Sequence, residues 1–259
     1  MIKLEHTVLA TNEQMDFVIE GMRNPKNSWD RSDSFACSKI TFCNDCIGLN
    51  DDSICEKLNG IGSADLNLMK TLAKAGPVHR KYMRMIPVYV RITAPLYWWK
   101  EFDTYKVGTV ANSCSTMHKI HTKEFTLEDF STDKIIDTGE PEYENMYDDL
   151  VLTLHFDCEK QYYDPHDIFS EILIPALNLY RKKYLETKDK KYWWQMIQLL
   201  PSSYNQTRNV MMNYEVLCNI YESRKDHKLD EWREFCSWIE SLPYSELITE
   251  PVNKKKKED

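Results

Sequence analysis

The second half of the chain repeats its apolar residues with helical spacing, and this pattern limits the fold to one with a substantial helical part. From Pro165 onward, apolar residues recur every three to four positions, as in helices that bury one face. Pro201 and Pro243 end two of these segments, because proline lacks the amide hydrogen that a continuing helix requires. The predicted helices cover residues 167–185, 190–200, 206–225 and 229–242.

The first half contains a clear strand and two shorter helices. Residues 85–93 are rich in β-branched side chains and alternate apolar with polar residues, which predicts a β-strand. Helical spacing over residues 12–24 and 65–75 predicts helices, the second of which ends at Gly76-Pro77. Together, the segments predict an α/β (α+β) fold with a central sheet and a helical C-terminal half.

The chain has no Gly/Ser linker and no internal repeat, so we predict a single domain over residues 1–245. A polar, Cys-containing insertion is expected around residues 30–60. Residues 246–259 combine a basic run with acidic residues, and we expect them to form a solvated tail.

The net charge of −8 excludes general nucleic-acid binding, which requires a basic surface. A small anionic ligand remains possible, because one local cluster of Arg and Lys is enough to bind it. No segment approaches the roughly 20 apolar residues of a membrane helix, and the N-terminal residues lack the apolar core of a secretory signal. We therefore expect a cytoplasmic protein without a membrane partner, whose eight cysteines are reduced thiols.

Four cysteines lie close together in the predicted insertion: Cys37, Cys43, Cys46 and Cys55. A C-x-x-C pair commonly supplies two thiolates of a tetrahedral zinc site. Here five residues separate Cys37 from the pair and eight separate the pair from Cys55, which is not the spacing of a standard zinc finger or ribbon. We interpret these residues as free cysteines and predict no metal, with a zinc site as the alternative.

The predicted helix at residues 206–225 carries polar side chains beside an apolar stripe. Asn213 and Arg224 lie eleven positions apart, which at about 100° per residue places them on nearly the same helical face. Burying an amide and a guanidinium without partners is costly. These side chains therefore either bond to neighbouring protein groups or face a ligand, and the spacing allows both.

The segment at residues 106–119 combines Gly108 with small hydroxyl residues and two lysines. Backbone N–H groups and serines in such a turn suit phosphate oxygens, and a lysine can neutralise their charge. Ser, Thr and Gly clusters also form ordinary loops, so this segment alone is not specific. Cys114 lies within it, and we interpret this residue as a small polar loop residue rather than a nucleophile.

The C-terminal segments resemble those of the flavin-dependent thymidylate synthases. That family has Leu-Pro followed by Asn, Asn and Arg at set intervals, and then a helix with Glu and Arg. The residues that keep these intervals are Leu200-Pro201, Asn213, Asn219, Arg224, Glu231 and Arg233. Glu215 departs from the family, which usually has Arg at this position.

The family's signature motif is kept only in part. Asn112 and Ser115 match it, and the position of its Arg-His-Arg is occupied by Tyr105-Lys106-Val107. Its Glu, Arg and Tyr are replaced by Ser113, Met117 and His118. Upstream, His79 and the strand at residues 85–93 resemble the segment that leads into the signature.

The resemblance implies a homotetramer with flavin and nucleotide sites shared between subunits. Its reaction moves a one-carbon unit from a folate to dUMP, with FAD as the flavin cofactor. Asn213, Asn219 and His79 are then expected at the flavin, and Arg224 at the uracil ring as the catalytic residue. The other residues that the resemblance assigns to the nucleotide are Lys106, Asn112, Ser113, Ser115 and Lys119.

The missing arginines change what this resemblance implies, because an Arg fork grips phosphate more strongly than the point charge of a lysine. Lys100, Lys106 and Lys119 remain as substitutes. Three interpretations stay open. The chain is an altered enzyme acting on dUMP or a related pyrimidine nucleotide, a non-catalytic protein of the same fold that sequesters or senses nucleotides, or a protein of unrelated function.

Overall fold

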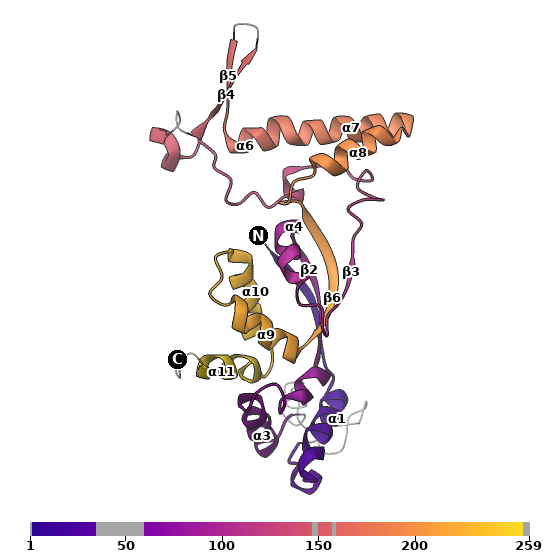
Figure 1. The fold of residues 1–259 in the computed structure, drawn as a ribbon, viewed down its shortest axis with the longest axis vertical. Coiled ribbons are helices and arrows are strands. Elements are labelled where there is room, and N and C mark those ends of the chain that lie inside the picture. Colours follow the sequence, from indigo (N-terminus) through magenta and orange to yellow (C-terminus); the bar gives the residue numbers. More distant parts are fainter. Residues whose placement is uncertain (1, 35–59, 147–149, 157–158, 256–259) are drawn as a thin grey trace, which may run out of the picture. The chain divides into compact units, whose positions relative to one another are not determined.

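The predicted strand is an inner strand of a four-stranded sheet with the order β1-β2-β6-β3 (Figure 1). Along it, Val88, Val90 and Ile92 are buried and alternate with more exposed residues. The inner pair is antiparallel, because Tyr214 N donates to Ile86 O at one end and Leu96 N donates to Tyr204 O at the other. The strands are β1 (Lys3–Leu9), β2 (Pro87–Pro95), β3 (Val110–Ser113) and β6 (Asn205–Asn213).

The prediction of a helix over residues 206–225 is wrong in its first half. Asn205–Asn213 form strand β6, and only Tyr214–Arg224 form a helix, α9. The apolar residues Val210 and Tyr214 are four positions apart, and this spacing fits both a helix and a strand, in which every second side chain shares a face. The pattern alone therefore does not separate the two structures.

The computed structural model describes residues 2–34, 60–146, 150–156 and 159–255. The four cysteines of the predicted insertion lie outside these residues, and the zinc alternative stays untested. The chain divides into two compact units. Unit 1 consists of residues 1–3, 93–103 and 113–208, and unit 2 of residues 4–92, 104–112 and 209–259. The single domain over residues 1–245 stays a prediction.

Unit 2 contains the helices of both chain ends. Three of them confirm predicted helices: α1 (Asn12–Arg23), α3 (Ser63–Lys74) and α10 (Asp230–Glu240). Short 3-10 turns cover Asn24–Lys26, Trp29–Arg31 and Lys81–Met85. Helix α9 contacts α10 and α11 (Glu246–Lys255), and most of its side chains are buried between its neighbours. The helix that follows β6 is therefore a central core element of this unit.

Residues 246–255, expected as part of a solvated tail, form a helix instead. Helix α11 buries Leu247 and Ile248 completely. Two aliphatic side chains gain roughly 1.5–3 kcal/mol each on full burial, which explains why this segment folds onto the unit. Ion pairs also connect it to α3, with Lys70 3.3 Å from Glu246.

Asp65, in the first turn of α3, is fully buried and holds the chain that precedes the helix. It accepts hydrogen bonds from Ser32 Oγ and Ser34 Oγ, both at 2.7 Å, and pairs with the guanidinium of Arg23. Burial alone would raise the pKa of Asp65, but the Ser34 and Ser32 hydroxyls and the Arg23 charge outweigh it and lower the pKa. The ionised carboxylate thus stabilises unit 2.

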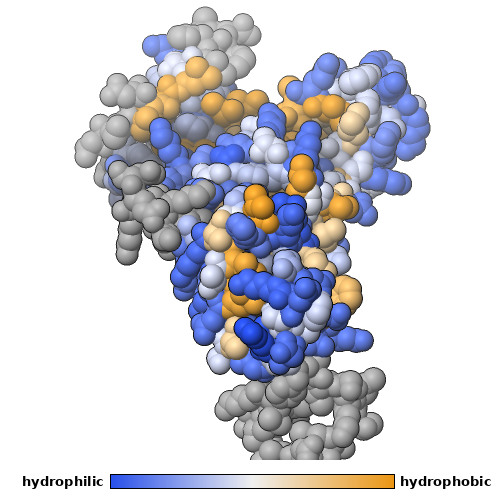
Figure 2. Space-filling view, turned by 60° about the horizontal axis from the view of Figure 1, so that its bottom comes forward, coloured by the Kyte–Doolittle hydropathy of each residue, from blue (hydrophilic) through white to orange (hydrophobic). Residues whose placement is uncertain are grey.

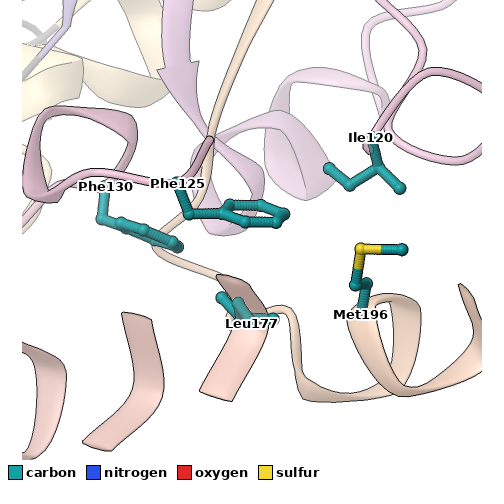
Figure 3. Close-up of a cluster of buried hydrophobic side chains, with 5 residues drawn as sticks. All are labelled: Ile120, Phe125, Phe130, Leu177 and Met196. Atoms are coloured by element: carbon teal, nitrogen blue, oxygen red, sulfur yellow. The ribbon is translucent and has the colours of Figure 1, made fainter. Parts of the chain in front are cut away.

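Unit 1 is built on a helical hairpin that confirms two further predicted helices, α7 (Ile174–Thr187) and α8 (Lys190–Leu199). A short α6 (Pro165–Asp167) and a π-helical turn, Ile168–Leu173, precede α7. The hairpin covers a cluster of buried side chains (Figure 3), in which the rings of Phe125 and Phe130 stack with centroids 6.5 Å apart. The cluster consists of Ile120, Phe125, Phe130, Leu177 and Met196.

Unit 1 also contains a short helix, a two-stranded sheet and the 3-10 turns Leu127–Asp129 and Pro141–Met146. The aromatic run after β2 forms α4 (Leu96–Phe102), which buries Trp98 and Trp99. Strands β4 (Leu152–Phe156) and β5 (Glu159–Tyr163) form an antiparallel pair. On the face drawn in Figure 2, hydrophilic residues dominate and hydrophobic ones lie in separate groups. Among the described residues, no helix is long and apolar enough to span a membrane.

Candidate functional site

Asn213 lies at the junction between β6 and α9 rather than on a helical face. It has extended backbone geometry as the N-cap of α9, and its side-chain oxygen accepts a hydrogen bond from Val216 N at 3.0 Å. This bond satisfies one of the amides that a helix leaves unpaired at its start. The side chain therefore has a structural role that the sequence alone does not reveal.

The segment that carries Lys106 packs against this junction. Gly108 has a φ of +80°, a conformation that L-residues rarely adopt. A Cβ atom on Gly108 would lie 2.9 Å from Asn213 Nδ2 and 3.1 Å from a methyl of Val216. The backbone here approaches α9 so closely that only glycine fits without displacement.

Arg224 lies at the other end of α9, half-buried among aromatic side chains. Its Nε donates to the Tyr105 hydroxyl at 2.9 Å, and its guanidinium lies 4.8 Å from the centre of the Trp232 ring. Arg favours such stacking on aromatic faces, and a guanidinium held in this way loses less conformational freedom when it binds a further group. Tyr105 and Trp232 thus hold the guanidinium of Arg224 in place.

The prediction that Asn213 lies within a helix, on the same face as Arg224, is wrong, because Asn213 is the extended N-cap residue in front of α9. Arg224 is the last residue of α9, so the two residues are eleven positions apart, which is the expected spacing of about three turns. At 1.5 Å per residue this corresponds to about 16 Å along the axis. The two side chains serve opposite ends of the helix.

Arg80 is a buried residue of this region that the sequence did not single out. Only 3% of its surface is exposed. Its Nη1 lies 3.0 Å from Cys218 Sγ, and its Nη2 donates to Asn219 Oδ1 at 3.3 Å. The amide of Asn219, which the resemblance places at the flavin, is itself exposed on α9 and is oriented by Arg80.

Arg80 also forms a buried ion pair with Glu215, with Nε and Oε2 2.8 Å apart. Neither of these two atoms makes a directed hydrogen bond, so the contact is chiefly Coulombic. The Glu215 carboxylate is therefore paired with a cation from a distant part of the sequence. In the sequence, the one sign of this pair was that Glu215 departs from the arginine usual in the resembled family. That departure does not indicate Arg80 as the partner.

The residues predicted to bind phosphate are not gathered in one unit. Exposed Lys106 and Asn112 belong to unit 2, as does His79, whereas Ser113, Ser115 and Lys119 belong to unit 1. Ser115 Oγ accepts hydrogen bonds from Met117 N at 3.3 Å and His118 N at 2.9 Å, so it stabilises its own turn. Cys114 is an exposed loop residue. The assignment of these residues to a ligand stays a prediction.

Comparisons with known proteins identify the fold. No protein-family model matches the chain, and no curated protein matches it significantly. Two crystal structures of the flavin-dependent thymidylate synthase ThyX from Helicobacter pylori with FAD and dUMP are similar to it. Each is 12% identical in sequence. The first has a TM-score of 0.55 and covers 96% of this chain and 98% of its own. The second has a TM-score of 0.54, with 97% and 99% covered. The chain therefore has the flavin-dependent thymidylate synthase fold.

Proposed function

We propose that this chain binds a flavin and a pyrimidine nucleotide, and that it transfers a one-carbon unit to dUMP or a related nucleotide. The main support is the correspondence of fold over almost the whole length of two structures that hold FAD and dUMP. The folate donor and a homotetrameric assembly with shared sites complete the proposal. Light scattering of the purified protein checks the tetramer.

Two of the chain's residues fit these ligands well. Arg224, held by Tyr105 and Trp232, is suited to polarise a pyrimidine carbonyl. Asn219 presents an amide whose orientation is fixed by Arg80, as a flavin ring edge requires. Asn213 fits less well, because its side-chain oxygen caps α9. A bound flavin would supply the hydride, while these residues position and polarise the reacting groups.

A second candidate function is nucleotide binding without catalysis, to sequester or sense the ligand. The observation that favours it is Glu215, which lies in a buried ion pair where the resembled family usually has arginine. A carboxylate at this position repels a phosphate rather than binding it. The family's Arg-His-Arg is also replaced, by Tyr105-Lys106-Val107, and the single lysine of this segment cannot bind phosphate in a bidentate manner.

Flavin content, nucleotide binding and turnover separate the two candidates. We expect the purified protein to show flavin absorbance near one per chain, to bind dUMP in calorimetry and to form a methylated nucleotide with a folate donor. Arg224→Ala should abolish nucleotide binding or turnover while circular dichroism remains unchanged. Arg91→Ala, which removes an exposed arginine of β2, is the control.

A colourless protein that still binds dUMP favours the non-catalytic candidate. Full dUMP binding and turnover in Arg224→Ala would remove this residue from the site.

A further inference from the structure

A cluster of cations surrounds His121 in unit 1. Arg181 Nε, on α7, donates to the backbone oxygen of His121 at 3.0 Å. The His121 ring lies edge-to-face on Tyr184, with centroids 4.9 Å apart, and Lys188 Nζ lies 5.7 Å from the centre of the same Tyr184 ring. Lys119 is two positions before the histidine. Arg181 and Tyr184 of α7 thus contact His121, and the charges of Lys188, Lys119 and Arg181 all act on its imidazole.

The loop that carries Lys119 and His121 is fixed in place. Ile120, between them, is 5% exposed and points into the core of unit 1 beside Met196 (Figure 3). Trp193 Nε1, on α8, donates to Met117 O at 3.0 Å just before this loop. The cations are therefore presented by a backbone that is anchored on both sides.

Carboxylates lie near the cluster, because Glu124 and Glu186 line one cavity with Arg181, but neither forms an ion pair with it. The carboxylates of the α7–α8 turn are engaged by other lysines, Glu186 with Lys183 at 3.9 Å and Asp189 with Lys191 at 3.0 Å. Within the described part of the chain, no ion pair involves the three cations around His121, namely Lys119, Arg181 and Lys188.

The imidazole itself reflects this imbalance. Burial, together with the charges of Lys188, Lys119 and Arg181, lowers the pKa of His121. Its buried Nδ1 also lacks a hydrogen-bond partner. The C-terminal end of α7 explains a cation at Lys188, because helix C-termini attract positive charge. It does not explain Lys119, which lies on a separate loop.

We propose that Lys119, Arg181 and Lys188 form a binding site for a phosphate-bearing small molecule. Two ammonium groups and a planar guanidinium supply several charged donors for the oxygens of a phosphate dianion. The chain's net charge of −8 disfavours long polyanions, so the ligand is a small one. The site extends beyond the proposed function, because it requires neither flavin nor folate and shares only Lys119 with the predicted nucleotide residues.

Calorimetry on the full chain tests the site, with pyrophosphate, inorganic phosphate, dUMP and uridine as probes at low and high salt. We expect pyrophosphate to bind, and Lys188→Gln and Lys119→Gln each to weaken binding about tenfold and reduce its salt dependence. Lys182→Gln, at an exposed neighbour on α7, is the matched control and should bind normally. Absence of pyrophosphate binding, or equal affinity in Lys188→Gln and wild type, overturns the proposal.

The probes also identify the source of the phosphate. Binding of dUMP that weakens in Lys188→Gln indicates a nucleotide ligand, whereas binding of pyrophosphate alone indicates free phosphate or pyrophosphate. Either result supports the site. Uridine binding that equals dUMP binding contradicts it, because uridine carries no phosphate.

His121 provides a second readout that a merely structural cluster would not give. A bound anion stabilises the imidazolium, so the NMR titration of His121 should move to higher pH with saturating pyrophosphate. An unchanged titration with pyrophosphate bound places the ligand elsewhere and refutes the assignment. If the wild-type protein holds no flavin but binds pyrophosphate through Lys188, the proposed function fails while the phosphate site stands. Failure of the proposed function can therefore be told apart from failure of this site.

Discussion

Removing the positive charge of Arg80 should destabilise unit 2 strongly. In Arg80→Met, the carboxylate of Glu215 loses its cation while it remains in a site where the residue is only 8% exposed. Breaking a buried pair from one side typically costs about 3–5 kcal/mol, because the remaining charge stays desolvated. Arg80 also bonds to Cys218 and Asn219, and losing those contacts acts in the same direction.

The corresponding shift in melting temperature is large enough to measure. For a chain of this size, 1 kcal/mol corresponds to roughly 2–4 °C, so Arg80→Met should melt about 6–20 °C below wild type in differential scanning calorimetry. The control is Lys74→Met, which breaks a largely exposed ion pair with Glu250 at 2.6 Å. Exposed pairs contribute about 0–1 kcal/mol, so this variant should melt within a few degrees of wild type.

A double variant separates the buried charge from lost packing. Arg80→Met combined with Glu215→Leu removes both charges and should recover most of the stability that the single change loses. The reasoning is refuted if Arg80→Met melts like Lys74→Met. It is equally refuted if the two changes simply add, because the ion pair would then contribute nothing beyond its separate side chains.

Three further changes test the anchors of unit 2. Asp65→Asn should destabilise by about 3 kcal/mol near neutral pH, because it leaves the buried Arg23 unpaired. The folded-state pKa of Asp65 is lowered, so its stabilisation is complete above the unfolded-state pKa of about 3.9 and is lost as pH falls through the folded value. Urea titrations from pH 7 downward should therefore show the variant and wild type converging in acid, and a constant difference would contradict this. Asn213→Ala should cost about 1 kcal/mol through loss of the N-cap, and Asn213→Asp should not. Gly108→Ala should cost roughly 1–2 kcal/mol, from positive φ and the contact with Asn213, and wild-type stability in urea unfolding would rule out this strain.

The sequence predicted most of the helices correctly, because each is long enough for the helical period to dominate. It failed at residues 206–213, where Val210 and Tyr214 satisfy the strand and the helix period equally. The sheet partner decides between them, through the hydrogen bond from Tyr214 N to Ile86 O. A contact across 128 positions is not encoded in any local pattern.

The candidate site could likewise be predicted only in part from the local sequence pattern. Arg224 could be chosen as a candidate from its spacing, whereas its contacts Tyr105 and Trp232 come from segments that the pattern does not connect. Arg80 was missed for the same reason, because its role depends on Glu215 in a distant helix. The sequence thus shows which residues keep family-like intervals. It does not show which side chains surround them in the fold.

The direct passage from β6 into α9 also affects which sequence changes evolution can accept. No loop separates the strand from the helix, so a single inserted residue in β6 would turn the following side chains to the other sheet face. It would also rotate α9 by about 100° about its axis, and would carry Arg224 away from Trp232. Insertions and deletions should therefore be excluded between residues 205 and 224. Homologues of this chain should keep this segment free of gaps even where their residues no longer match.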